Sequence, residues 1–278
     1  MHYLDEGPRD APPVLMLHGN PTWSFYYRNL VLALRDRFRC IVPDHVGCGL
    51  SDKPGDADYA YRLERRIADL DRLMDHLALE RPLSLVVHDW GGMIGFGWAA
   101  ARPEAISRTV ILNTAAFRMP ADKKFPPALW FAGRTRPGAL LVRALNAFSG
   151  IAAQVAFKKP VSREIRRCYT GPYDSWANRI ATLRFVQDIP LRPSDPGYDI
   201  LADTEAHLGE FAGKPALLGW GERDFVFDRI FLRRWRELLP DAEVHAFADC
   251  GHYVLEDAGD ALVRPIGDFL DRHETPGG

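Results

Sequence analysis

An aspartate at the centre of a short glycine-containing motif is the residue best placed to do chemistry. Asp89 follows the apolar run Leu83–Val87 and precedes Trp90-Gly91-Gly92 and a helix-like stretch over 93–101. A strand, a sharp turn with small residues and a helix together form a nucleophile elbow, whose usual apex residue is serine. A carboxylate at the apex predicts attack on an electrophilic carbon and formation of an ester with the protein. The neighbouring indole offers one N–H donor and no acceptor, which suits departure of an anionic leaving group.

Hydrolysis of such an ester needs a base for water, and His252 is our candidate. It lies in the segment Asp249–Tyr253, a glycine-containing loop after the last predicted strand. The order nucleophile, acid, histidine that accompanies this kind of elbow places the histidine there. Asp224 follows an earlier strand and is expected to accept from the imidazole and fix its tautomer. We interpret the nearby Glu222 as a surface or loop-bracing charge.

A second loop, His18-Gly19-Asn20-Pro21, is predicted to hold negative charge. The backbone N–H groups of Asn20 and Trp90 are expected to bind the oxyanion of the hydrolysing ester. The Asn20 side-chain amide adds a neutral donor beside the Trp90 indole, and such a pair could hold a departing halide. A turn-capping role is the alternative for Asn20. We interpret His88 as a structural residue under the elbow and Asp44 as a brace for its own turn.

Strands and helices alternate around these loops. Strands are predicted at Val14–Leu17, Cys40–Pro43, Leu83–Val87, Thr109–Asn113, Pro215–Trp220 and Glu243–Phe247, and helices at Phe25–Leu34, Tyr61–Leu77, Phe231–Leu239 and Ala258–Leu270. Continuous apolar strands that alternate with helices predict an α/β fold with a mostly parallel central sheet flanked by helices. Met1–Glu6 looks like an inner strand with nothing before it, so we expect either a truncated start or a shorter sheet edge.

The segment 117–208 interrupts this alternation. It is rich in proline, arginine and aromatic residues and contains no clear strand. We predict a helical cap domain at 117–208, above the carboxyl ends of the strands where α/β folds bind ligands, and a core domain at 1–116 and 209–278. Aromatic side chains are expected to line an apolar pocket there, unless they only pack helices together. The candidates are Trp130, Phe148, Trp176, Phe185 and, from the core, Phe225.

The overall composition is ordinary for a globular protein. The 278 residues are 47% hydrophobic and 26% charged, with a net charge of −2. This balance gives no reason to propose nucleic acid or an anionic membrane as a partner. The absence of a long apolar run and of a signal peptide predicts a cytoplasmic location. We interpret the cluster Arg163, Arg166 and Arg167 as a solvated helix face.

No cofactor is expected from the sequence. No His, Cys, Asp and Glu residues cluster at metal-ligand spacing, so no metal is predicted. No glycine-rich phosphate loop follows a strand, so no nucleotide is predicted either. The expected partner is a small apolar electrophilic substrate.

The motifs match one family as a set, over about Met1 to about Leu270. They are His18–Trp23, Asp89–Gly92, Gly221–Asp224 and Gly251-His252, and together they resemble the haloalkane dehalogenases of the α/β-hydrolase superfamily. An acid after the later strand, combined with an asparagine halide donor, is similar to the third dehalogenase subfamily.

This resemblance implies the α/β-hydrolase fold and a role for each motif. Asp89 is the implied nucleophile, His252 the base, Asp224 the acid, and Asn20 with Trp90 the halide-binding pair. Our primary prediction is a haloalkane dehalogenase-type hydrolase. Displacement of halide gives an alkyl-enzyme ester, which histidine-activated water hydrolyses to an alcohol.

A second family is close. The segments Pro172–Ile180 and Phe185–Leu191 resemble the β-lactone decarboxylases of bacterial long-chain olefin biosynthesis, which share this catalytic set. That resemblance implies attack by Asp89 on a cis-disubstituted β-lactone, loss of carbon dioxide and departure of a cis-alkene. It also implies assembly with other olefin-pathway proteins.

Two further alternatives rank lower. An epoxide hydrolase uses two cap tyrosines, for which Tyr169 and Tyr173 are present, but Asn20 has no task in that scheme. A ligand-binding protein without catalysis has no need of an intact nucleophile, acid and histidine.

Overall fold

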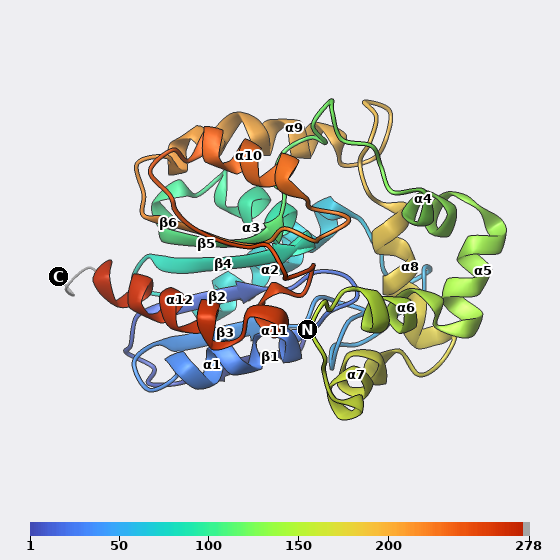
Figure 1. Cartoon of the computed structure of the whole chain (residues 1–278), viewed down its shortest axis with the longest axis horizontal. Coiled ribbons are helices and arrows are strands. Elements are labelled where there is room, and N and C mark those ends of the chain that lie inside the picture. Colours follow the sequence, from blue (N-terminus) through green and yellow to red (C-terminus); the bar gives the residue numbers. More distant parts are fainter. Residues whose placement is uncertain (275–278) are drawn as a thin grey trace.

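A seven-stranded sheet lies between two layers of helices in the computed structural model, which describes residues 1–274 (Figure 1). The last four residues of the predicted core domain fall outside this range. The strand order is β1-β3-β2-β4-β5-β6-β7, and every neighbouring pair except β1 and β3 is parallel. The strands are β1 (Tyr3–Glu6), β2 (Pro13–Leu17), β3 (Arg39–Pro43), β4 (Leu83–Asp89), β5 (Ile106–Thr114), β6 (Ala216–Gly221) and β7 (Glu243–Phe247). The predicted mostly parallel sheet is confirmed.

The first strand lies at one edge of the described sheet. We predicted an inner strand at Met1–Glu6, whereas β1 pairs only with β3, antiparallel. Within the described residues β1 has a single strand neighbour and is only partly buried, while β2 and β3 are buried along their whole length, and the inner position stays a prediction.

Helices cover both faces of the sheet, and the sheet separates two apolar cores. One core includes Leu70, Ile94 and Trp235, and the other includes Leu30 and Ile266. The helices concerned are α1 (Arg28–Leu34), α2 (Leu63–Leu77), α3 (Trp90–Ala99), α10 (Arg229–Leu238), α11 (Val254–Ala258) and α12 (Asp260–Arg272). Figure 1 shows α1, α11 and α12 on one side and α3 and α10 on the other. The predicted helices are confirmed: the one expected at Ala258–Leu270 is α12, and the one expected at Phe25–Leu34 begins as a 3-10 turn at Ser24–Tyr27 that continues into α1.

The segment between β5 and β6 is helical, as its pattern predicted. It contains α4 (Pro127–Arg134), α5 (Arg136–Leu145), α6 (Ala147–Val155), α7 (Arg163–Thr170), α8 (Ile180–Gln187) and α9 (Tyr198–His207). Helices α4 to α8 contact one another beyond one end of the sheet, whereas α9 contacts α3 on its flank (Figure 1). None of the described helices is by itself long and apolar enough to cross a bilayer. Only α5 and α6 taken as a pair, bent by 79°, meet that criterion.

Candidate active site

Asp89 occupies a sharp turn between β4 and α3. Its φ of +51° and ψ of −123° lie in a region that residues with a Cβ rarely adopt. Close approach of neighbouring segments holds the turn, because a Cβ on Gly91 would collide with the carbonyl of Leu17. The hydroxyl of Thr114 donates to the carbonyl of Asp89 from the adjacent strand. The strand-turn-helix expected from the sequence is therefore present, and its apex carries the carboxylate.

Backbone donors surround the Asp89 carboxylate. The N–H of Asn20 donates to Oδ1 at 2.6 Å, and the N–H of Trp90 also bonds this carboxylate. Gly19 permits this approach, since a Cβ there would overlap the Asp89 side chain. Burial raises the pKa of Asp89, while His252 and the two backbone N–H groups act in the opposite direction. The two donors expected to hold an oxyanion thus converge on the carboxylate itself.

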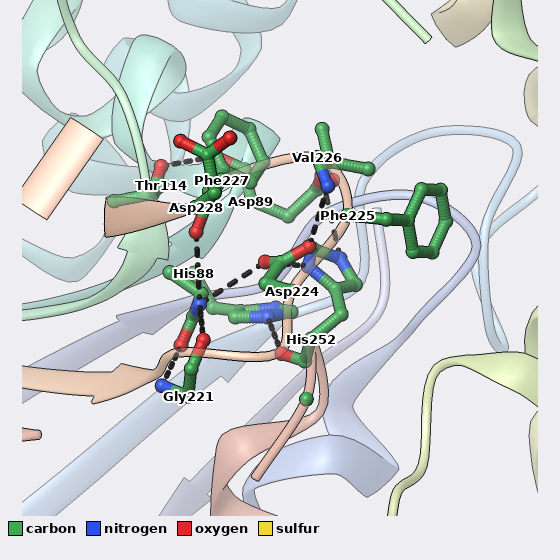
Figure 2. A network of polar contacts seen from close by, with 12 residues as sticks. His88, Asp89, Thr114, Gly221, Asp224, Phe225, Val226, Phe227, Asp228 and His252 are labelled. Carbon is green, nitrogen blue, oxygen red and sulfur yellow. Dashed lines mark hydrogen bonds and ion pairs between the residues drawn. The ribbon is translucent and has the colours of Figure 1, made fainter. Parts of the chain in front are cut away.

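His252 lies between two carboxylates, as Figure 2 shows. Its Nδ1 is 2.7 Å from Asp224 Oδ2, and its Nε2 is 3.6 Å from Asp89 Oδ2. Because a carboxylate only accepts, Nδ1 must carry a proton. Burial lowers the pKa of His252, but Asp224 and Asp89 raise it by more, and the net direction is upward. The side chain can therefore act as a base through Nε2 or, once protonated, as a cation beside Asp89.

Asp224 is fixed in place by a residue of its own loop and by a residue of β5. Its Oδ1 accepts from the N–H of Val226 at 2.8 Å, and its Oδ2 accepts from the Asn113 side chain at 3.0 Å. Glu222, the rival acid, instead forms an ion pair with Arg229 at 2.7 Å. The structure thus brings Asp224, and not Glu222, to the histidine.

Asn113 is a positioning residue that the sequence reasoning missed. It lies near the end of β5 and also bonds the backbone of Gly221 in both directions, at 2.8 and 3.0 Å. A polar residue at the carboxyl end of a buried parallel strand, beside the strand that precedes Asp224, was the available signal.

Asn20 and Trp90 present neutral donors next to Asp89. One hydrogen of the Asn20 amide goes to the carbonyl of Thr182 on α8, at 3.0 Å. Within residues 1–274, Asn20 Nδ2 has no further protein acceptor, Asn20 Oδ1 is buried without a donor, and the Trp90 indole N–H makes no hydrogen bond to the protein. Both side chains line the same cavity as Asp89. An anion that leaves a carbon attacked by Asp89 would meet these donors.

Phe185 supports the site from behind. We predicted it in the pocket wall, but it is fully buried and absent from the cavity lining. Its ring packs against Trp90 at a centroid distance of 5.0 Å, and the guanidinium of Arg66 stacks on it at 3.5 Å. The helix that carries Phe185 turns this side chain toward the core, where it holds the indole in place.

A cavity of about 310 Å³ lies above Asp89, and nearly all of its wall is apolar. Phe148 and Phe225 line it, as expected. Trp130 and Trp176 do not, because both are half-exposed on the outside, where Trp176 stacks on Arg143 at 4.6 Å. Wall residues that no sequence signal identified include Met93, Phe117, Leu141, Ile151 and Phe227. Such a wall suits an alkyl chain.

The two residues interpreted as structural have that role. His88 is buried, its Nε2 donates to the carbonyl of His252 at 2.8 Å, and its ring stacks on Tyr26 at 4.3 Å. Asp44 accepts from the N–H groups of Ser24 and Leu50.

Among residues 1–274, no group of three His, Cys, Asp or Glu side chains could hold a metal ion.

Comparisons with known proteins place the chain among α/β hydrolases. The family model described as alpha/beta hydrolase fold matches residues 12–259. A cis-3-alkyl-4-alkyloxetan-2-one decarboxylase of Shewanella oneidensis is 56% identical over 99% of this chain and 86% of its own length. A haloalkane dehalogenase of Mycolicibacterium paratuberculosis is 34% identical over 96% of this chain and 86% of its own length. The crystal structure of a putative ancestral haloalkane dehalogenase superposes with a TM-score of 0.87 at 29% identity, covering 98% and 95% of the two chains.

Proposed function

Since the chain belongs to the α/β-hydrolase fold family, we propose that it decarboxylates a cis-3,4-dialkyl β-lactone to a cis-alkene, with Asp89 as nucleophile. The observation that carries this proposal is the 56% identity to a decarboxylase of such lactones over nearly the whole chain. The dehalogenase relative is 34% identical. This order reverses the ranking that the sequence suggested, in which the dehalogenase came first.

In the first step, a carboxylate oxygen of Asp89 attacks C4 of the lactone, the alkyl-bearing ring carbon that is bonded to the ring oxygen. The bond between that carbon and the ring oxygen breaks, and its electron pair leaves with the oxygen. The product is an ester of Asp89 whose neighbouring carbon carries a free carboxylate. The neutral donors of Asn20 and Trp90 lie beside Asp89 and would stabilise this new anion.

In the second step, the bond between C3, the neighbouring carbon, and the new carboxylate breaks and carbon dioxide leaves. Its electron pair forms the carbon–carbon double bond, and the bond from carbon to Asp89 breaks. Asp89 is restored as a carboxylate, and no water or proton is consumed. Inversion in the first step followed by an anti elimination in the second converts a cis lactone to a cis alkene.

In this cycle His252 acts through its charge. Protonated His252, with Nε2 3.6 Å from Asp89 Oδ2, would stabilise the carboxylate that departs in the second step. The upward shift of the His252 pKa, to which Asp224 and Asp89 contribute, favours this protonated form. Asp224 would hold the ring in place and help to keep it charged.

Haloalkane dehalogenation is the second candidate, because two neutral donors beside a nucleophilic carboxylate suit a halide equally well. Here Asp89 displaces the halide, and His252 in its neutral form activates the water that hydrolyses the ester. The two candidates therefore use the same residues but opposite protonation states of His252.

Labelled water distinguishes the candidates. The protein is incubated with a cis-dialkyl β-lactone or a bromoalkane in oxygen-18 water, products are identified by gas chromatography, and the peptide containing Asp89 is weighed. We expect a cis-alkene and an unlabelled Asp89 with the lactone, because that cycle breaks only the alkyl–oxygen bond. Bromoalkane hydrolysis would place the label in Asp89, which serves as the positive control. A β-hydroxy acid in place of the alkene would contradict the proposal.

A further inference from the structure

Apolar side chains gather on the outer surface of α4, α5 and α6. Each of the following is at least 40% exposed, and we name them the apolar crest: Phe131, Leu140, Leu141, Leu145, Ile151 and Val155. In Figure 1 these three helices lie at the end of the molecule opposite α12. Contiguous exposed apolar surface on a protein marks a contact with another apolar phase or partner.

The crest is continuous with the active-site cavity. Phe131, Leu141, Ile151 and Val155 belong both to the crest and to the cavity wall. The cavity thus opens onto the crest, and Asp89 lies at its inner end. An apolar molecule could move between the crest and Asp89 along a wall that is almost entirely apolar.

The helices around the crest are strongly basic. Residues 127–187, from α4 to α8, contain ten Lys and Arg but two Asp and Glu, a net charge of +8 in a chain whose total is −2. Arg136, Arg163 and Arg167 are exposed and have no ion-pair partner within residues 1–274. Asp195, Asp249 and Asp56 pair with Arg134, Lys159 and Arg184 and offset part of this charge, but basic residues remain in excess at this end of the molecule. This segregation removes our reason for discounting an anionic membrane.

We propose that the apolar crest docks on the surface of an anionic lipid bilayer and exchanges apolar molecules with it through the cavity mouth. Apolar side chains surrounded by basic residues are the composition of interfacial membrane anchors. Each arginine near an anionic surface adds attraction that salt weakens. A protein partner would have to offer an apolar and acidic face, whereas a bilayer supplies both properties and also dissolves alkyl chains. The proposal does not rest on the proposed reaction, because docking is measured without turnover.

Vesicle sedimentation tests the docking. The full chain is mixed with vesicles of phosphatidylglycerol and phosphatidylethanolamine, or of phosphatidylcholine alone, and the pelleted fraction is measured. We expect binding to the anionic vesicles that weakens with added salt, and little binding to the neutral ones. Equal binding to both would overturn the role of charge, and no binding to either would overturn the proposal.

Matched variants locate the surface. Leu140→Ser combined with Leu145→Ser removes crest side chains outside the cavity wall, and we expect binding to fall about thirtyfold. Arg163→Glu combined with Arg167→Glu should weaken binding at least about tenfold. The control pairs are Leu32→Ser with Leu50→Ser, and Arg35→Glu with Arg264→Glu, all exposed and outside α4–α8.

The binding of the folded variants decides whether the apolar crest is the docking surface. Circular dichroism confirms that the variants are folded. Crest variants that bind as the controls do would overturn the proposal. Self-association that the leucine pair abolishes, without vesicle binding, would identify the crest as an interface between copies of this chain.

Discussion

Replacing Asp224 with asparagine separates the two uses of His252. Asp224 contacts Nδ1 at 2.7 Å, and a hydrogen bond to a charged group contributes about 1.5–3 kcal/mol. At about 1.36 kcal/mol per pKa unit, its loss should lower the His252 pKa by about one to two units. The imidazole would then lose its proton at a lower pH than in the unaltered protein, and it would be in an unfavourable tautomer as well.

The two reactions need opposite protonation states of His252, so their rates in the variant should respond to pH in opposite directions. Water activation needs neutral His252 with Nε2 free, so bromoalkane hydrolysis should fall by about 10⁴-fold, as expected for a misplaced tautomer. Alkene formation needs the cation beside Asp89. At the 3.6 Å separation, an ion pair in a medium of effective dielectric about 20 is worth about 4.6 kcal/mol at most, so the rate should fall by up to about two-thousandfold.

Acid should restore alkene formation in the variant. Protonated His252 is present below its pKa, so lowering that pKa moves the alkaline limb of the rate profile to lower pH. The acid limb stays where Asp89 becomes protonated, at a pKa that burial raises. The active window should therefore narrow from its alkaline side. The assay is the rate of alkene release by gas chromatography from pH 4 to 9, in the Asp224→Asn variant and the unaltered protein.

The result that refutes this reasoning is an alkaline limb at the same pH in both proteins. That outcome would mean that the charge of His252 does not assist departure of Asp89. The Glu222→Gln variant is the matched control, because Glu222 lies on the same loop and pairs with Arg229 instead. It should leave the profile unchanged.

Four other substitutions test the site. Asp89→Asn should abolish both alkene and bromide release, and measurable turnover in this variant by either assay would eliminate the nucleophile assignment. His252→Ala should accumulate an alkyl-enzyme with a bromoalkane, seen as a mass increase of the intact protein; lost activity without an adduct would place His252 in the first step. Gly19→Ala should lower kcat by at least about a hundredfold, because its Cβ would displace the Asp89 carboxylate, and a normal kcat would show that the carboxylate can adapt. Asn113→Ala should lower the free energy of unfolding in urea by about 3–5 kcal/mol, because the buried N–H of Gly221 loses its acceptor and the buried carboxylate of Asp224 loses a donor, and a loss under 1 kcal/mol would contradict its bracing role.

Much of the fold was predictable because it is encoded locally. The strands β2 to β6 are short buried apolar runs, and α2 repeats its apolar residues at helical spacing, so neighbours in sequence suffice to identify them. The edge position of β1 was not predictable in this way. Strand order depends on which segments pair, and pairing joins residues far apart in the chain.

The residues of the candidate site were likewise predictable where the signal lies nearby in the sequence, and not where it depends on distant segments. Asp89 was recognisable because a strand, a turn and small residues all lie within a few positions of it. The histidine followed from its loop and its order in the chain. Asn113 was missed because its partners, Gly221 and Asp224, are more than one hundred residues away.

The sequence by itself determined the kind of chemistry, since the residue type at the elbow and the motifs around it limit what can react. The tertiary structure decided which side chains meet the substrate and the surroundings. The rotation of α6, α4 and α8 turns Phe148 into the cavity, Trp130 outward and Phe185 behind Trp90. The same packing gathers basic and apolar residues at one end of a chain whose composition is unremarkable. Helix rotation is set by contacts between distant segments, and no local pattern encodes it.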